Sequence, residues 1–253
     1  MRKFLRPILK KISKKIRIFT HKNYLKYYRQ RSEFKKLGGI ITHTYPILWD
    51  YDAEAGSASG HYFHQDLVVA SYINKKNPIR HIDIGSRIDG FVAHVASFRK
   101  IEIIDVRELK SLDHNNISFI KADLMNAENA EENITDSISC LHAIEHFGLG
   151  RYNEPLDPNG HKKAFENIVK MLKIGGSLYI SFPIANSNEV HFNAHRVFNP
   201  KDIFVWSNHC KKLKLENFDY VDDSGNLHRN INLDREKLDL KWGCGIYSFT
   251  KIL

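Results

Sequence analysis

The chain has 253 residues, of which 42% are hydrophobic and 26% charged, so it is long enough for one large α/β domain with an ordinary soluble composition. Its net charge of +9 is concentrated in residues 1–31, which hold 12 Lys and Arg and no Asp or Glu; the remainder has 26 basic residues (38 less 12) against 29 acidic ones. This distribution argues against a nucleic-acid-binding surface on the body of the protein. Three scattered cysteines without a CxxC pair argue against a disulfide framework, and we expect a cytoplasmic protein.

The N-terminal tail, residues 1–31, is predicted to form a basic amphipathic helix. Its apolar residues recur at spacings of three and four and therefore share one helical face. Such a helix suits an anionic membrane surface, which would place the protein peripherally on the inner face of the plasma membrane. Packing of the apolar face on the body of the protein is the plainer alternative, and nucleic acid is the partner that we expect least. The apolar residues are Leu5, Ile8, Leu9, Ile12, Ile16 and Phe19.

Residues 32–79 are predicted as a connector followed by an N-terminal helical segment, and residues 80–253 as one domain. Within this domain, short β-like runs alternate with helical runs. Alternation of this kind predicts a mostly parallel sheet with helices on both faces. Strands are predicted at 80–84, 101–106, 117–121, 138–142, 177–182, 213–221 and 246–252, and helices at 91–98, 162–172 and 199–208.

Acidic residues and glycines stand where the first three of these strands end. In an open α/β sheet, ligands bind at the carboxyl ends of the strands. The loop after the first strand lacks the Lys and Ser/Thr of a phosphate-binding loop, and Arg87 interrupts the GxGxxG pattern, so a nucleoside ligand without phosphates is favoured. An acid at the end of the second strand can accept both ribose hydroxyls, and one after the third can accept the adenine amine. The plain alternative is that these acids cap turns. The residues are Asp83, Gly85, Ser86 and Gly90, then Asp105 and Val106, then Asp123 and Leu124.

The order of the motifs DIGS, IIDV, KADL, CLHAIEH and LKIGG resembles the class I S-adenosylmethionine (SAM)-dependent methyltransferases over about residues 80–183. The resemblance implies SAM as cofactor and a Rossmann-like, seven-stranded, mostly parallel sheet closed by a C-terminal antiparallel hairpin. The sulfonium and amino groups of SAM favour a nearby carboxylate such as Asp83. His142, Tyr62 and Gln65 are further candidates for cofactor binding, the latter two because an N-terminal segment can fold over the methionine end.

Three longer stretches carry a second resemblance. GHYFHQDL at 60–67, EHFGLGRYNEPLDPNG at 145–160 and HFNAHRVF at 191–198 are similar to a bacterial family of uncharacterised methyltransferase-like proteins associated with surface-polysaccharide gene clusters. This resemblance implies a glycan or nucleotide-sugar substrate.

Histidines follow the fourth and fifth strands, where an acceptor would meet the methyl group. His146 or His195 can act as a general base on an acceptor hydroxyl. Alternatively, Glu145, His146 and His195 can bind a divalent metal, or these side chains only line the pocket. Candidate catalytic residues are therefore His146, His195 and Glu145, and candidate substrate-binding residues are Arg151, Tyr152 and His191.

The function expected from the sequence is SAM-dependent O-methylation of a sugar hydroxyl in surface glycan biosynthesis. Two alternatives stay open. One is a SAM- or nucleotide-binding enzyme that modifies sugars by another reaction. The other is a membrane-tethered, non-catalytic scaffold with a degenerate methyltransferase fold.

Overall fold

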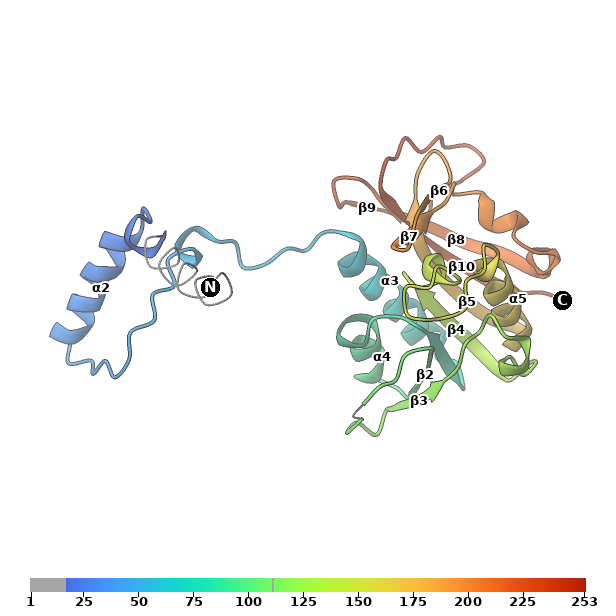
Figure 1. The fold of residues 1–253 in the computed structure, drawn as a ribbon, viewed down its shortest axis with the longest axis horizontal. Coiled ribbons are helices and arrows are strands. Elements are labelled where there is room, and N and C mark those ends of the chain that lie inside the picture. Colours follow the sequence, from blue (N-terminus) through green and yellow to red (C-terminus); the bar gives the residue numbers. More distant parts are fainter. Residues whose placement is uncertain (1–16, 111) are drawn as a thin grey trace, which may run out of the picture. The chain divides into compact units, whose positions relative to one another are not determined.

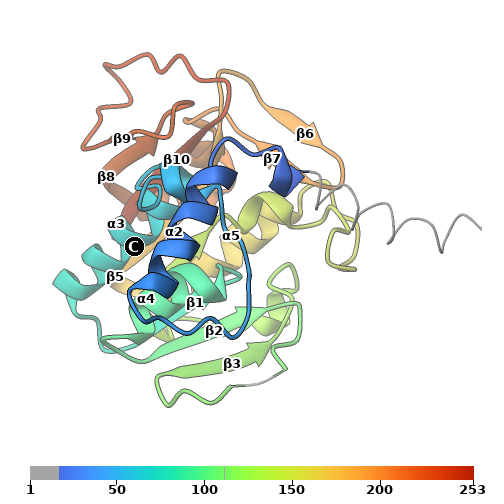
Figure 2. The same cartoon turned by 90° about the vertical axis from the view of Figure 1, so that its left-hand side faces the viewer.

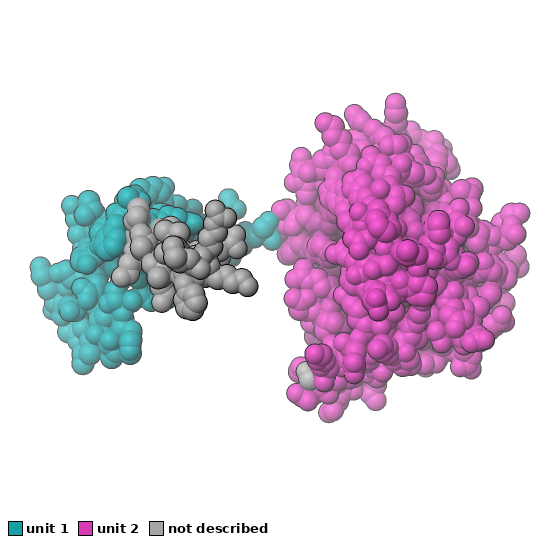
Figure 3. All heavy atoms as spheres, viewed as in Figure 1, with its two compact units in different colours: residues 1–57 teal, residues 58–253 magenta. Residues whose placement is uncertain are grey.

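The computed structural model describes residues 17–110 and 112–253, and the chain divides into two compact units, Met1–Ser57 and Ala58–Leu253 (Figure 3). Much of the predicted tail helix, up to residue 16, lies outside the described residues. No helix within the described ranges is both long and apolar enough to span a bilayer.

The first unit contains helix α2 (Tyr24–Lys36) and the 3-10 turn η1 (Asp50–Asp52). No residue of α2 is buried, and the helix ends before Gly38-Gly39, where residue 38 has a positive φ. The Asn23 side-chain amide donates to the carbonyl of Leu48 and to Asp52, and so ties the helix start to η1. The helix crosses the predicted boundary between tail and connector at residue 31, because residues 24–36 contain no Gly or Pro to stop it.

Membrane contact by the tail stays a prediction. We expect the whole chain to co-sediment with vesicles containing anionic lipid, and deletion of residues 1–31 to reduce the bound fraction several-fold, because about 1 kcal/mol is lost with each basic residue near the surface. Vesicles of neutral lipid are the control. Equal binding of the full-length and shortened chains would rule this role out.

The second unit is built on a sheet of eight strands in the order β3-β2-β1-β4-β5-β10-β8-β9 (Figure 1). The first five strands pair in parallel, and β10 runs antiparallel to both β5 and β8. This confirms the Rossmann-like fold with its antiparallel closing strands. The eighth strand, β9, is only two residues long and lies in the polar segment 222–241, for which the sequence predicts no strand. The strands are β1 (His81–Ile84), β2 (Ile101–Asp105), β3 (Ile117–Lys121), β4 (Thr135–Leu141), β5 (Leu172–Ile184), β8 (Leu213–Val221), β9 (Leu227–His228) and β10 (Gly243–Lys251).

Helices cover both faces of the sheet (Figure 1). On one face α3 (His61–Lys76), the π-helical turn η2 (Ile88–Val92) and α4 (Ala93–Ala96) pack Val69, Ile73 and Val95 against Ile101 and Ile103. On the other face the core contains α5 (Gly160–Met171) and the 3-10 turn η5 (Asp202–Val205), with η6 (Asn208–Lys212) packed beside it. Successive strand residues point to opposite faces, so strands such as β2 and β5 supply both cores.

Two segments differ from the sequence prediction. The unit begins at Ala58, whereas the sequence predicts a domain start at residue 80; the reason is that α3 packs its apolar face into the sheet core. The helix predicted from Asn199 to about residue 208 is instead two short 3-10 turns, η5 and η6.

A separate hairpin of β6 (Glu189–His191) and β7 (His195–Val197) stands outside the main sheet (Figures 1 and 2). His191 pairs with His195 across it. The sequence does not predict this hairpin, because each strand has only three residues and no alternating pattern of useful length. It is held by Arg196, whose buried guanidinium donates to the carbonyls of Phe147 (2.7 Å) and Glu145 (3.3 Å). The hairpin is thereby fixed to the 3-10 turn η4 (Ile144–His146) that follows β4.

Candidate active site

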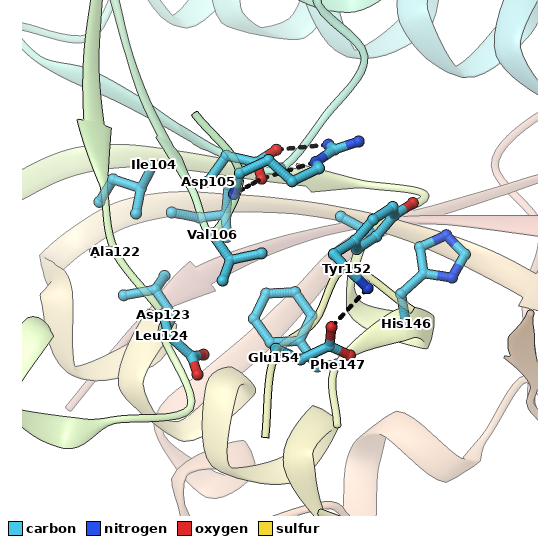
Figure 4. Close-up of a pocket in the computed structure, with 14 residues that line it drawn as sticks. Ile104, Asp105, Val106, Ala122, Asp123, Leu124, His146, Phe147, Tyr152 and Glu154 are labelled. Atoms are coloured by element: carbon cyan, nitrogen blue, oxygen red, sulfur yellow. Dashed lines mark hydrogen bonds and ion pairs between the residues drawn. The ribbon is translucent and has the colours of Figure 1, made fainter. Parts of the chain in front are cut away.

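A pocket lies at the carboxyl ends of β1 to β4. This is the edge of the sheet where open α/β folds bind ligands. Figure 4 shows Asp123 and Leu124 at one end of the pocket and Tyr152 and His146 at the other. Residues at this edge that line it include Gly85, Asp105, Val106, Asp123, Leu124, Phe147 and Glu154.

The middle of the pocket is formed by Gly85 and Asp105. Gly85 has a φ of +65°, and a Cβ atom there would lie 3.2 Å from the Cβ of Ala143 and 3.9 Å from Oδ2 of Asp105. The absence of a side chain therefore leaves the Asp105 carboxylate open to a ligand that passes over the glycine. Arg107 donates to this carboxylate from its backbone N–H and from Nε and Nη2, at 2.6–3.0 Å. Each carboxylate oxygen has more than one lone pair, so ribose hydroxyls can still be accepted.

The Asp123 carboxylate lines the other end of the pocket beside Leu124, which is buried. One of its oxygens accepts from the backbone N–H of Met125 at 2.9 Å and thereby fixes the turn. Ala122 and Phe147 supply apolar surface next to it. A carboxylate with apolar neighbours suits a flat heterocycle that carries an exocyclic amine.

Four residues predicted to bind the cofactor line neither this pocket nor the adjoining second pocket described below. They are Asp83, Ser86, Gly90 and Gln65. Asp83 is fully buried and accepts hydrogen bonds from Ser86 Oγ and Ser139 Oγ, both at 2.6 Å, and from the Ser86 N–H. Burial raises the pKa of Asp83 to about 6, against the effect of these hydrogen bonds. The residue shapes the loop after β1 from within and is not in contact with the pocket.

Ser86, Gly90 and Gln65 have similar internal roles. Ser86 Oγ also accepts from the Leu141 N–H. A Cβ at Gly90 would lie 2.6 Å from Oδ2 of Asp66, so this glycine makes room for a protein carboxylate. Gln65 is buried and accepts from Ser181 Oγ at 2.6 Å, which ties α3 to β5.

A second pocket adjoins the first and shares four lining residues with it, Gly85, Arg107, His146 and Tyr152. It is the place where an acceptor would lie beside a bound cofactor. Its walls bring together segments that are far apart in sequence: the start of α3, the loop after β4, the β6–β7 hairpin and the segment before β10. They carry the predicted Tyr62, His142, Glu145, Arg151 and His195, and also His61 and Trp242, which the sequence pattern does not single out.

His146 lines both pockets and is arranged as a base. Its Nδ1 lies 2.7 Å from the carbonyl oxygen of Ala194, which can only accept, and 3.2 Å from Arg151 Nη1, which can only donate. The shorter contact favours the tautomer with the proton on Nδ1 and the lone pair on Nε2. Burial, together with the charge of Arg151, lowers the pKa of His146 although Glu145 opposes this. The side chain is therefore neutral near pH 7.

Glu145 does not contact solvent and is paired with His142. Its Oε1 lies 3.0 Å from His142 Nδ1 and 3.8 Å from His146 Nε2, and its side chain is 1% exposed. Burial works against ionisation of Glu145, but the hydrogen bond and charge of His142 outweigh it and lower the pKa. Glu145 therefore orients His142 from the wall of the second pocket.

His195 belongs to a chain of hydrogen bonds on the hairpin. His195 Nε2 lies 3.2 Å from His191 Nδ1, and His191 Nε2 lies 2.6 Å from Glu189. Burial and the neighbouring His191 lower the pKa of His195. The ring centroids of His195 and Trp242 are 4.7 Å apart, so His195 forms one aromatic wall with Trp242. His191 stands behind this wall and does not line the pocket.

Tyr152 lines both pockets, and Arg151 lines the second. Two guanidinium groups lie over the Tyr152 ring, with Arg107 at 4.3 Å and Arg151 at 5.3 Å from its centroid. Arg151 also donates to the Ala194 carbonyl that His146 uses. The Glu154 carboxylate fixes this loop by accepting from the N–H groups of Gly150 and Tyr152.

Of the predicted metal set, Glu145 Oε1 and His146 Nε2 lie 3.8 Å apart and His195 lines the same pocket, but the three side chains do not form a group whose ligand atoms all lie within 4.8 Å of one another. Across the described ranges 17–110 and 112–253, one group of three His, Cys or carboxylate side chains has its potential ligand atoms within 4.8 Å of one another: His61, His142 and Cys244.

The fold is the Rossmann-like fold that several solved methyltransferase structures share. A putative sarcosine dimethylglycine methyltransferase from Galdieria sulphuraria superposes with a TM-score of 0.54 and 13% identity, over 88% of this chain and 97% of that one. A putative methyltransferase from Bacillus halodurans gives 0.53 and 13%, over 74% and 99%. The (4+2)-cyclase SpnF also gives a TM-score of 0.53 and 13% identity, over 87% of this chain and 91% of that one. At this identity the likeness shows a shared fold.

The chain belongs to the family described as Caenorhabditis protein of unknown function, DUF268, whose model matches residues 91–241. This range holds β2 to β5, the hairpin and the loop after β4. The comparison with curated proteins gives no match.

Proposed function

We propose that this chain is a SAM-dependent methyltransferase whose cofactor lies across Gly85 with its ribose on Asp105. The observation that supports this most is the open carboxylate of Asp105 beside a glycine of positive φ, in a pocket that continues toward His146. The chemistry of the pocket fits the cofactor: a carboxylate for the ribose, another for the adenine amine, and no phosphate-binding loop.

In the proposed mechanism, Asp105 accepts the ribose hydroxyls and Asp123 the adenine amine. SAM, when bound, supplies an electrophilic methyl group. Residues of the second pocket hold the acceptor in line with that methyl group, and positioning of this kind supplies most of the rate enhancement. His146 Nε2 takes the proton of the acceptor hydroxyl as its oxygen attacks.

We further propose that the acceptor is a sugar hydroxyl in surface glycan biosynthesis. The resemblance of three stretches to a polysaccharide-associated family supports this, and so does the composition of the second pocket. Trp242 offers an aromatic face, while His195 and Arg151 offer polar groups around it. The guanidinium of Arg151 can also bind a phosphate of a nucleotide sugar.

Transfer of a labelled methyl group from SAM to a panel of nucleotide sugars and glycolipids tests this proposal. We expect label in a sugar product, with loss of the label when the reacting hydroxyl is replaced by hydrogen. If SAM binds but no sugar acceptor is labelled, the sugar proposal is wrong. Label in a non-sugar acceptor would keep methyl transfer and change the substrate class.

One observation favours a second candidate, an enzyme that binds SAM without methyl transfer. SpnF shares the fold and is named as a cyclase. Chemical change of a sugar substrate without incorporation of label would favour this candidate over the first.

A further inference from the structure

Three side chains from distant parts of the sequence meet beside the second pocket. His61 begins α3, His142 follows β4, and Cys244 is the second residue of β10. Each offers one ligand atom, and the three atoms lie within 4.8 Å of one another. Two imidazole nitrogens and a thiolate are a ligand set that suits Zn²⁺ and similar divalent transition metals.

His142 is oriented as a metal-binding histidine usually is. Its Nδ1 pairs with Glu145 Oε1 at 3.0 Å, which leaves Nε2 as the ring atom that can bind a metal. The side chain is 6% exposed, and Nε2 is buried without a hydrogen-bond partner among the described residues. Histidines that bind a metal commonly donate their other N–H to a carboxylate. A metal ion would satisfy the buried nitrogen.

Cys244 is fully buried and is a free cysteine. In the sheet it pairs with Pro183 of β5, which itself lines the second pocket. The thiol does not line that pocket, so it is badly placed to attack a substrate directly. It is well placed to bind an ion that His61 and His142, which do line the pocket, hold at its wall.

We propose that His61, His142 and Cys244 bind a divalent transition-metal ion, with Zn²⁺ the best match, and that its fourth position faces the second pocket. Three protein ligands and one open position are the usual form of a catalytic zinc site. The role of the ion rests on the proposed function. Its charge would favour loss of the acceptor proton to His146 Nε2; the oxygen–methyl bond then forms as the sulfur–methyl bond breaks, leaving S-adenosylhomocysteine.

Metal-free full-length chain titrated with Co²⁺ tests this site directly. We expect one equivalent to bind with tetrahedral absorption bands and a thiolate-to-cobalt charge-transfer band. Cys244→Ser should abolish the charge-transfer band, and His61→Ala should weaken Co²⁺ and Zn²⁺ binding by about tenfold or more. Cys210 is a half-buried cysteine elsewhere in the chain, and Cys210→Ser should leave the charge-transfer band and the metal affinity unchanged. His195→Ala should also bind as the wild type does, which distinguishes this site from the set predicted from sequence.

A wild-type chain without the charge-transfer band would overturn the proposal. So would a band that persists in Cys244→Ser, or a folded Cys244→Ser variant that shows lower thermal stability and unchanged metal affinity, since Cys244 would then have a packing role alone. The titration needs no SAM. Metal binding without SAM binding would support this site and refute the proposed function. SAM binding without metal binding would refute this site and leave the proposed function intact.

Discussion

Asp105→Ala is expected to weaken SAM binding by about 10- to 150-fold. The carboxylate faces the space above Gly85, where it would accept the ribose hydroxyls, and hydrogen bonds to a charged group contribute about 1.5–3 kcal/mol. Arg107 would also lose its partner and leave a positive charge beside the ribose site. Equilibrium dialysis with labelled SAM measures the change.

Glu102→Ala is the matched control. Glu102 lies on the same strand, β2, and is paired with an arginine through two short hydrogen bonds, from Arg80 Nε (2.7 Å) and Nη2 (2.6 Å). It is near the opposite end of the strand and lines neither pocket. Its removal should leave SAM affinity within about twofold, the scatter expected for a site with no shared contact. Equal weakening by both substitutions, or wild-type affinity in Asp105→Ala, would show that the carboxylate does not bind the cofactor.

His146→Ala is expected to lower kcat by about 10²- to 10⁴-fold, the contribution of a positioned general base. Burial lowers the pKa of His146, so its ring is neutral near pH 7, and the short contact of Nδ1 with the Ala194 carbonyl favours the lone pair on Nε2. A base acts only when neutral. The wild-type rate should therefore fall as pH decreases through a pKa below that of an ordinary histidine, and stay level at neutral pH.

The variant should lose this acidic limb of the pH–rate profile, which a merely structural role for His146 would not produce. His195→Ala is the comparison, since His195 lines the same pocket and is the other candidate base. A small effect of His146→Ala together with a collapse of the rate in His195→Ala would reverse the assignment.

Residues at strand ends are predictable, because the alternation of strands and helices in the sequence locates the carboxyl edge of the sheet. Asp105, Asp123 and their neighbours line the pocket for this reason. Asp83 stands at the same edge, but its carboxylate points inward to Ser86 and Ser139. Sequence spacing places a residue at a strand end and leaves the direction of its side chain open.

Contacts between distant segments account for the residues that sequence patterns miss. The group of His61, His142 and Cys244 spans most of the chain, and none of the three lies in a local metal-binding pattern. Trp242 and Arg196 likewise act through residues distant in the sequence, as in the Arg196 hydrogen bond to Phe147, 49 positions away, and the ring contact of Trp242 with His61. Arg107 is the one with a local signal: an arginine two residues after a strand-end aspartate can fold back onto it.

Calorimetric titration of the full-length chain with SAM tests the central claim most directly. We predict one binding site per chain for SAM, competition by S-adenosylhomocysteine, and no competition by ATP or a nicotinamide dinucleotide, because the loop after β1 lacks a phosphate-binding pattern. A chain that is folded by circular dichroism yet takes up neither SAM nor S-adenosylhomocysteine would contradict the account.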